Sequence, residues 1–300
     1  MPADPPLVTD VPPMTGQPPV IDLHCHSSAS DGTRPPGDVI ARAAAAGVAV
    51  LALTDHDTVA GLAEAAAALP AGMTLVPGME LSCERDGHSV HLLAYLFDPG
   101  HEELARQCLA IRASRADRAR EMVDRLAALG APVTWAQVAA IAGDGVVGRP
   151  HIAQAMVESG VIGSADEAFT PDWLAAGGRA YAPRYALGLA EAIGLVHAAG
   201  GVTVLAHPFA TARGWADAGQ LTAELARIGL DGVEVDHPDH DRLQRDVLRD
   251  VAGSLDLVVT GGSDDHGARS GDRIGCESTS DADLERLLAA AALAPLRSRP

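Results

Sequence analysis

The sequence of 300 residues contains no lysine, and all 22 of its basic residues are arginine. Several enzyme classes depend on a lysine amine, which holds nucleotide phosphates or forms an imine with a substrate or cofactor. The absence of lysine therefore excludes a phosphate-loop NTPase, a pyridoxal-phosphate enzyme, a Schiff-base aldolase and a protein kinase.

Basic residues are also outnumbered by acidic ones. The 22 arginines stand against 40 aspartates and glutamates, which gives a formal net charge of −18. A surface that binds duplex nucleic acid requires cationic patches, so we expect no duplex DNA partner. A phosphorylated substrate is still compatible with this charge, because bound divalent cations can invert it locally.

Cysteines and long apolar runs are scarce. The four cysteines, Cys25, Cys83, Cys108 and Cys276, match neither a CxxC pair nor a disulfide framework, which favours reduced thiols in a cytoplasmic protein. No window resembles a membrane span, so we expect no membrane partner. Residues 1–19 are rich in proline and lack basic residues, which predicts a disordered tail rather than a secretory signal.

After this tail, short apolar runs alternate with alanine-rich helical stretches, which predicts an α/β fold with a parallel sheet, either open or closed into a barrel. Aromatic residues are only 3% of the chain, so its core must be built mainly from aliphatic side chains. The seven predicted strands are Val20–Cys25, Val48–Thr54, Met73–Leu81, Val90–Phe97, Val202–Ala206, Gly232–Asp236 and Leu257–Gly261.

A purely helical stretch interrupts the alternation between the fourth and fifth strands. Residues 99–184 contain no convincing strand, and their helical patterns include one over Ala165–Leu174. We therefore predict that residues 20–98 and 185–300 form one domain, and that residues 99–184 are a helical insertion.

Histidines and carboxylates gather at the ends of the predicted strands. Asp22, His24 and His26 share one face of the first strand, because residues i and i+2 of an extended chain point the same way. In an α/β barrel such strand ends meet on one rim. Mixed imidazole and carboxylate ligands suit Zn²⁺, Mn²⁺ or Fe²⁺, and about nine ligands exceed the needs of one ion, which favours two or three divalent metals.

These residues lie in motifs that resemble the polymerase-and-histidinol-phosphatase (PHP) phosphoesterase superfamily. The motifs are DLHCHSSASDG (22–32), TDHDT (54–58), GMELSC (78–83), HLLAY (91–95), AHP (206–208) and GSDDHG (262–267). GRPHIA (148–153) and the helical insertion resemble the subgroup of nucleoside 3′,5′-bisphosphate phosphatases and 5′→3′ exonucleases that trim short RNAs. The resemblance implies a distorted seven-stranded (β/α)7 barrel that holds three metals.

The resemblance also implies roles for individual residues. The implied ligands are His24, His26, Glu80 and Asp264 for the first metal, His91 and His207 with a shared Glu80 for the second, and Asp31, His56 and His266 for the third. Glu80, Asp31 and His207 are the predicted catalytic residues. We expect Asp22, and also Asp55, to orient imidazoles, and we interpret Asp57 as a helix N-cap.

Candidate substrate contacts lie outside the metal motifs. Arg149 and His151 begin a predicted helix, where a guanidinium and a helix start favour anion binding. The alternative for Arg149 is an ion pair that docks the insertion. His237 follows the sixth strand and is either a substrate contact or a solvated loop residue.

The resulting hypothesis is a metal-dependent phosphoesterase in which a metal-bridging hydroxide attacks phosphorus. The expected cofactors are two to three ions of Mn²⁺, Zn²⁺, Fe²⁺ or Mg²⁺. The expected substrate is a small phosphorylated nucleotide, with the insertion as a lid, and no obligate protein partner is evident. The alternatives are a 5′→3′ exonuclease on short single-stranded RNA, a histidinol-phosphate-type phosphatase and a non-catalytic metal-binding module.

Overall fold

The computed structural model describes residues 19–143, 145–211 and 218–298. The tail predicted for residues 1–19 therefore lies, except for Pro19, outside the described residues. No helix in the described part of the chain combines the length and the apolarity that a bilayer crossing requires.

Seven strands form a continuous hydrogen-bonded path, and each corresponds to a predicted strand, so the α/β prediction is confirmed. In path order they are β1 (Val20–Asp22), β2 (Val48–Leu53), β3 (Thr74–Arg85), β4 (His88–Tyr95), β6 (Val202–Leu205), β7 (Gly232–Asp236) and β8 (Val258–Gly261). The chain beyond β8 bonds to the chain beyond β1: the Leu23 N–H donates to the Gly261 carbonyl at 3.1 Å, and the Asp264 N–H donates to the His24 carbonyl at 2.7 Å. These bonds connect the segments that follow the two outermost strands of the path.

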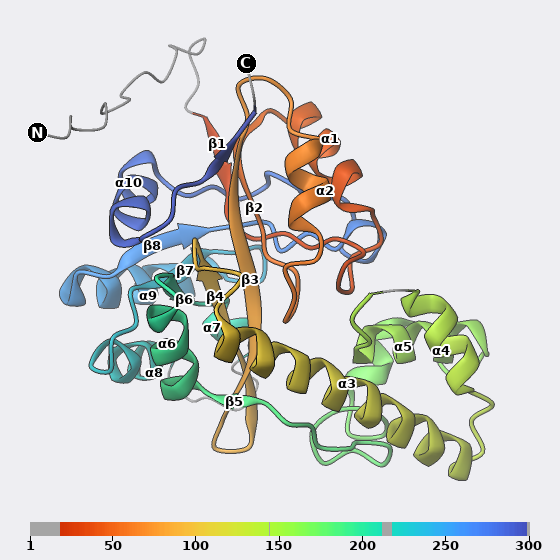
Figure 1. The fold of residues 1–300 in the computed structure, drawn as a ribbon. Coiled ribbons are helices and arrows are strands. Elements are labelled where there is room, and N and C mark those ends of the chain that lie inside the picture. Colours follow the sequence, from red (N-terminus) through yellow and green to blue (C-terminus); the bar gives the residue numbers. More distant parts are fainter. Residues whose placement is uncertain (1–18, 144, 212–217, 299–300) are drawn as a thin grey trace, which may run out of the picture.

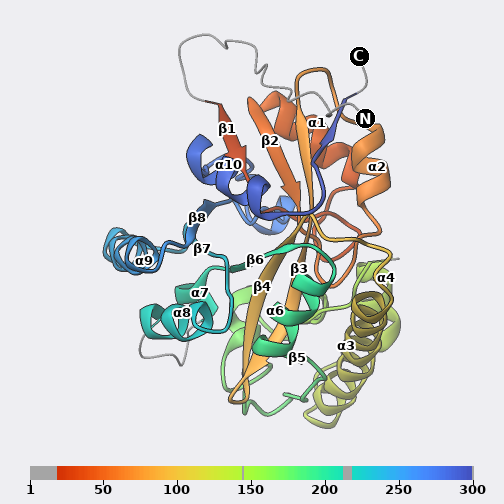
Figure 2. The same cartoon turned by 60° about the vertical axis from the view of Figure 1, so that its left-hand side comes forward.

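The prediction of a parallel sheet is wrong at β4, which runs antiparallel to both β3 and β6. The cause is a two-residue turn at Asp86 and Gly87, both of which have positive φ angles of 52° and 80°. Asp-Gly is a strong signal for a tight hairpin. The β3–β4 hairpin extends beyond the other strands (Figures 1 and 2), and two short strands, β5 (Leu187–Gly188) and β9 (Leu296–Arg297), pair with β3.

Helices lie around the strands and bury aliphatic side chains against them. They are α1 (Pro36–Ala45), α2 (Leu62–Ala67), α6 (Leu189–Ala198), α7 (Pro208–Thr211), α8 (Ala218–Ala226), α9 (Arg242–Leu255) and α10 (Asp281–Ala290). In α6, for example, Ala192, Ile193 and Val196 are buried at helical spacing, one turn apart. Leu92 and Leu205, partners across β4 and β6, lie in the same hydrophobic cluster.

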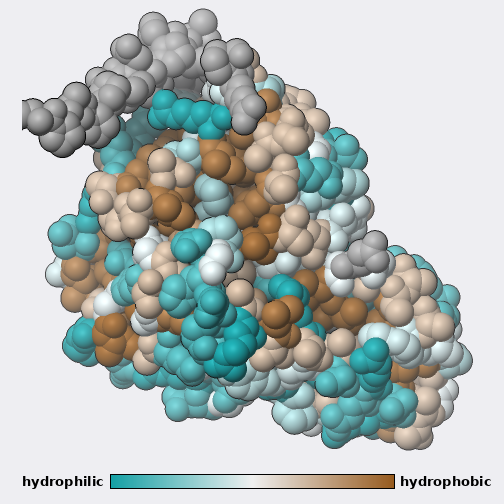
Figure 3. All heavy atoms as spheres, in the orientation of Figure 1, coloured by the Kyte–Doolittle hydropathy of each residue, from teal (hydrophilic) through white to brown (hydrophobic). Residues whose placement is uncertain are grey.

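The segment between β4 and β5 is helical and stands to one side of the sheet (Figure 1). It consists of α3 (Glu102–Ala128), α4 (Trp135–Ala142), α5 (Arg149–Glu158) and the 3-10 turn η1 (Ala165–Phe169). Met122, Val138 and Met156, one from each α-helix, belong to a hydrophobic cluster made within this segment. Hydrophilic residues line the exposed side of α3 (Figure 3), where Glu121 pairs with Arg125.

The prediction of a helix over Ala165–Leu174 is wrong beyond Phe169. Only Ala165–Phe169 is helical, and it is a 3-10 turn. Pro171 follows Thr170, whose backbone is extended, with φ −99° and ψ 164°. The residue before a proline avoids the helical region, which explains why the helix stops there.

Candidate metal centre

The carboxylate of Glu80, buried on β3, lies among five imidazoles that come from different parts of the chain. Its two oxygens face different rings. Oε1 lies 2.7 Å from His91 Nδ1 and 3.0 Å from His207 Nε2. Oε2 lies 3.5 Å from His24 Nε2, 3.2 Å from His26 Nε2 and 3.1 Å from His56 Nδ1. A carboxylate placed in this way has the geometry of a bridge between two cations.

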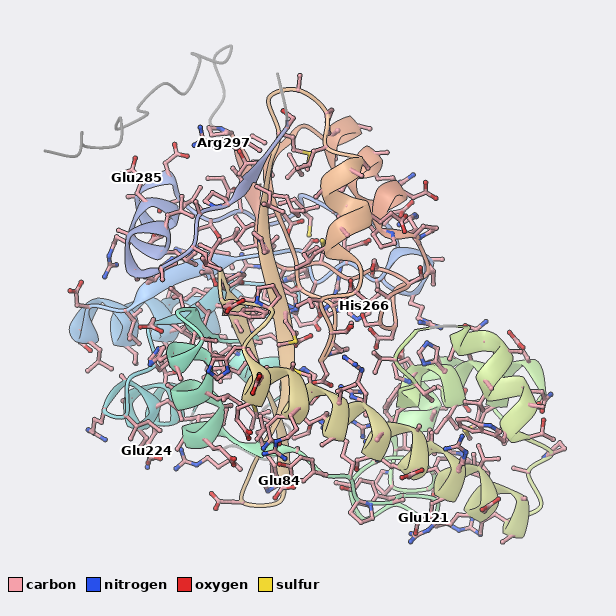
Figure 4. All side chains as sticks on the ribbon, in the orientation of Figure 1. Glu84, Glu121, Glu224, His266, Glu285 and Arg297 are labelled. Atoms are coloured by element: carbon pink, nitrogen blue, oxygen red, sulfur yellow. The ribbon has the colours of Figure 1, made fainter. Side chains whose placement is uncertain are left out.

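All nine predicted ligands fall into compact groups of potential metal-binding atoms. Within each group, the candidate ligand atoms lie within 4.8 Å of one another. The groups are His24, His26, Glu80 and Asp264; His56, Glu80 and His91; His26, Asp31, His56 and His266; and His24, His207 and Glu234. Residues far apart in sequence therefore meet at one place, near the junction with the insertion, where Figure 4 labels His266.

Some buried polar atoms in this cluster have no hydrogen-bond partner, and they indicate whether a cation would fit here. Among the described residues, His26 Nδ1, Asp31 Oδ1 and Asp264 Oδ1 are buried and accept or donate no hydrogen bond. Leaving such atoms without a partner is costly in a protein interior, and a bound cation would supply the missing interaction. The donor set of imidazoles and carboxylates is the one that borderline divalent metals prefer, so the residues fit divalent metal binding.

The charges of the cluster couple the carboxylates to the imidazoles. Burial opposes ionisation of Glu80, but His91, His56 and His24 outweigh it and hold the pKa of this carboxyl well below its usual range. Burial lowers the pKa of His56 to about 3, which keeps the ring neutral. Burial opposes the charge on His26, but Asp264 and Glu80 outweigh it and raise the pKa of this ring to about 10. Metals bind ionised carboxylates and neutral imidazoles, so cation binding here would release a proton from a ring such as His26.

Backbone strain lies at two of the predicted ligands. His207 has φ 25° and Asp264 has φ 47°, values that non-glycine residues rarely adopt. A hydrogen bond from the backbone N–H holds each residue in place. The His207 N–H donates to Glu234 Oε2 at 2.8 Å, and the Asp264 N–H donates to the His24 carbonyl at 2.7 Å. Strain of this kind persists where the surrounding structure enforces it, typically at functional sites.

The sequence analysis assigned no role to Glu234 on β7, although the residue is fully buried in the cluster. Its Oε1 lies 2.9 Å from His24 Nδ1, which leaves His24 Nε2 facing Glu80 and Asp264. When a histidine binds a metal through one ring nitrogen, a carboxylate bonded to the other nitrogen fixes the tautomer and orientation of the ring. The available signal was an acidic residue between two valines of a buried strand.

Two aspartates that were expected to orient imidazoles do not. Asp22 instead accepts backbone N–H groups, from Ser263 at 2.9 Å and from Gly275 at 2.8 Å. Asp55 accepts from the Ser27 and Ser30 hydroxyls, both at 2.6 Å. Both carboxylates therefore hold the loops that carry the ligands and leave the rings to other partners.

The interpretation of Asp57 as a helix N-cap is also wrong, because α2 begins only at Leu62. The Asp57 carboxylate accepts from the Ser82 N–H and hydroxyl, both at 2.7 Å, and from Arg115 Nε at 2.8 Å. Arg115 lies on α3, so this buried contact ties the helical insertion to the residue that follows His56.

The three predicted substrate residues lie around the cluster. Arg149 begins α5, stacks 5.6 Å from the Phe169 ring centre and makes no ion pair with the described residues, so the docking ion pair is not seen. His151 is buried and accepts from the Gly148 N–H at 3.0 Å. His237 is buried rather than solvated, with Nε2 3.4 Å from Asp264 Oδ2.

Replacing Glu234 with glutamine tests its role in orienting His24. The amide cannot accept with the same strength from His24 Nδ1, so we expect the affinity for Mn²⁺ to fall about 10- to 100-fold. Titration of chelator-treated protein with Mn²⁺ by calorimetry measures this affinity. The exposed Glu285→Gln is the matched control, and unchanged affinity in Glu234→Gln would contradict the orienting role.

Comparisons with known proteins agree with this geometry. Residues 22–132 match the PHP domain. A 5′-3′ exoribonuclease of Haemophilus influenzae is 36% identical over 246 residues, which cover 82% of this chain and 89% of the relative. A 3′,5′-nucleoside bisphosphate phosphatase of Chromobacterium violaceum is 35% identical over 262 residues, with coverage of 84% and 89%.

A solved structure shares the whole architecture. A protein of Bifidobacterium adolescentis, provisionally assigned as a metal-dependent phosphoesterase, superimposes with a TM-score of 0.82 and 36% identity, covering 92% of this chain and 98% of its own. The relatives named above cleave phosphoric ester bonds, and the cluster around Glu80 has the ligand chemistry that such hydrolysis uses. This chain therefore belongs to the PHP family and is a metal-dependent hydrolase of phosphoric esters.

Proposed function

We propose that this chain releases phosphate from small nucleotides, with nucleoside 3′,5′-bisphosphates as the main substrate class. The observation that carries the proposal is the buried Glu80 carboxylate, whose two oxygens face different sets of imidazoles at 2.7–3.5 Å. Two divalent ions held at such a carboxylate would stabilise both the attacking and the leaving oxygen of an in-line displacement. The similarity to the Chromobacterium violaceum phosphatase supports the nucleotide as substrate.

The chain's own residues would hold two or three divalent ions. Glu80 would bridge a site completed by His24, His26 and Asp264 and a second completed by His91 and His207, whose ring nitrogens lie 2.7 Å and 3.0 Å from Glu80 Oε1. Asp31, His56 and His266 would hold a third ion. Bound divalent cations lower the pKa of water and neutralise charge on the phosphoryl oxygens. Arg149 would bind the substrate's anionic groups, and the buried side chain of His151 would hold the start of α5 beside them.

The helical segment 99–184 would act as the lid and substrate domain. It brings Arg149 and His151 to the start of α5, and Arg115 anchors it beside His56 through Asp57. Because these contacts come from a segment with its own hydrophobic cluster, substrate selection would reside there, apart from the ligands on the strands.

A second candidate activity is 5′→3′ exonuclease action on short RNA. It is favoured by the 36% identity to the Haemophilus influenzae exoribonuclease. The net charge of −18 disfavours long nucleic acids, but a short single strand carries few phosphates and can reach a cation-lined site.

A phosphate-release screen tests the proposal. With Mn²⁺ supplied, we expect faster release from adenosine 3′,5′-bisphosphate than from 5′-AMP, histidinol phosphate or a 5′-phosphorylated short RNA. Excess EDTA should abolish release, and added Mn²⁺ should restore it.

Each alternative gives a different result in the same screen. Preferred release of mononucleotides from RNA would assign the exonuclease activity instead, and preferred turnover of histidinol phosphate would assign that phosphatase. No turnover of any phosphoester with Mn²⁺ bound would leave a non-catalytic metal-binding protein.

A further inference from the structure

A cavity of about 380 Å³ lies between the β3–β4 hairpin and the helical insertion. The hairpin contributes Cys83, Glu84, Gly87, His88, Ser89 and His91. Figure 4 labels Glu84 at the far end of β3. The opposite wall comes from α3, from the start of α5 and from the segment that leads from η1 to β5. This volume suits a small organic ligand of nucleotide size.

Three arginines from separate elements line this cavity: Arg118 on α3, Arg149 on α5 and Arg184 before β5. Their hydrogen bonds go to neutral groups. Arg118 Nε donates to the Ala182 carbonyl at 2.7 Å, Arg149 Nη1 donates to the Leu174 carbonyl at 3.4 Å, and Arg184 Nη2 donates to the Ser89 hydroxyl at 3.2 Å. None of the three forms an ion pair with an acidic residue in the described part of the chain.

Arg184 gives the clearest sign that a partner is missing. Its Nη1 is buried and donates no hydrogen bond to any described residue. A buried guanidinium nitrogen without an acceptor is costly, and structures rarely leave one unless a ligand or an ion completes it. A neighbouring anion is the natural acceptor, because a guanidinium binds phosphate oxygens with paired donors.

The three guanidiniums also repel one another. Burial and the neighbouring arginines lower the pKa of Arg118 to about 9 and that of Arg184 to about 10, so both still carry charge at neutral pH. Burial and the nearby Arg115 likewise lower the pKa of Arg149. Glu84 is the acidic residue among the described lining residues, but its side chain is exposed, so water screens its charge.

The cavity adjoins the metal centre through His91. This residue lines the cavity, and its Nδ1 lies 2.7 Å from Glu80 Oε1. A ligand in the cavity can therefore reach the metal centre with one end while its other end contacts the arginines. The rings of Phe169 and Tyr181 also line the cavity. Arg149 lies over the Phe169 ring at 5.6 Å and Arg118 over the Tyr181 ring at 5.3 Å, so the two rings help to position these guanidiniums.

We propose that Arg118, Arg149 and Arg184 bind a second phosphate of the substrate, one that is not cleaved. The inference rests on the proposed phosphatase function and deepens it, because it makes the enzyme selective for nucleotides that carry phosphates on both sides of the ribose. A monophosphorylated nucleotide leaves the three charges unneutralised and binds more weakly.

The variant Arg184→Met tests this inference, since it keeps the length of the side chain and removes its charge. We expect the ratio of kcat/KM for adenosine 3′,5′-bisphosphate to that for 3′-AMP to fall about tenfold or more, because a charge-assisted hydrogen bond is lost. Arg106→Met is the matched control on an exposed arginine of α3 and should leave the ratio unchanged. The ratio is the relevant readout, because a general loss of fold or metal lowers both values together.

A binding measurement separates this inference from the proposed function. Calorimetry with chelator-treated protein and adenosine 3′,5′-bisphosphate should show about tenfold weaker binding to Arg184→Met than to wild type or Arg106→Met. If Arg184→Met binds more weakly but the wild type turns over no nucleotide, the proposed phosphatase function is refuted and the anion site is still supported. Equal binding to all three proteins and an equal kcat/KM ratio would overturn the anion site.

The source of the second phosphate is tested with the 5′-phosphorylated dinucleotide pApA. For a site that fits one nucleotide, Arg184→Met should weaken binding of adenosine 3′,5′-bisphosphate at least as much as binding of pApA. A loss confined to pApA would place an RNA backbone phosphate at the arginines and overturn the mononucleotide assignment.

Discussion

Replacing Glu80 with glutamine is expected to lower phosphate release at least about a thousandfold. The amide keeps the size of the side chain but loses the charge and one of the two oxygens that face His91 and His26. A metal supplies several kcal/mol of transition-state stabilisation, and each 1.4 kcal/mol corresponds to a factor of ten in rate. Initial rates of phosphate release with saturating Mn²⁺ measure the effect.

Glu285→Gln is the matched control for this variant. Glu285 is exposed on α10, at the upper left of Figure 4 and away from His266, and we expect its replacement to leave the rate unchanged. A folded Glu80→Gln protein with at least one-tenth of the wild-type rate would show that the bridging carboxylate is not needed.

Replacing Arg115 with methionine is expected to lower the free energy of unfolding by about 3–5 kcal/mol, the usual cost of leaving one partner of a buried ion pair alone. Arg115 donates to the Asp57 carboxylate at 2.8 Å, and both side chains are buried. Burial opposes ionisation of Asp57, and Arg115 outweighs it and holds the pKa of that carboxyl below its usual value. Urea unfolding followed by circular dichroism measures the change.

The control for this prediction is Arg106→Met, on the same helix. Arg106 pairs with Glu103 at the surface, where an ion pair contributes about 0–1 kcal/mol. Equal stability of Arg115→Met and Arg106→Met would mean that the Asp57–Arg115 contact does not hold the insertion against the strands.

The seven strands and the meeting of their polar ends were predictable because both depend on local pattern. Apolar runs bounded by glycine, proline and polar residues mark buried strands, and residues at i and i+2 share a face. His24 and His26 illustrate this, since their Nε2 atoms lie 3.2 Å apart in the structure. The direction of β4 was also predictable from Asp86-Gly87, a hairpin signal that the sequence analysis did not use.

The surroundings of the ligands were harder to predict because they depend on distant contacts. Glu234 reaches His24 from 210 residues away, and Arg115 reaches Asp57 from 58 residues away. Neither pairing can be predicted from neighbouring residues in the sequence. The first depends on how β7 packs, and the second depends on how α3 packs. The same is true of Arg118 and Arg184. They lie in one cavity only because α3 and the chain before β5 both line it.

The central claim is that Glu80 and the surrounding imidazoles hold a shared set of divalent cations. Mass spectrometry of the metal content of protein reconstituted with Mn²⁺ and then freed of excess metal tests it most directly. We expect two to three equivalents in the wild type and in Glu285→Gln, and at least one fewer in Glu80→Gln. Fewer than two equivalents in the wild type, or the same content in wild type and Glu80→Gln, would contradict the claim.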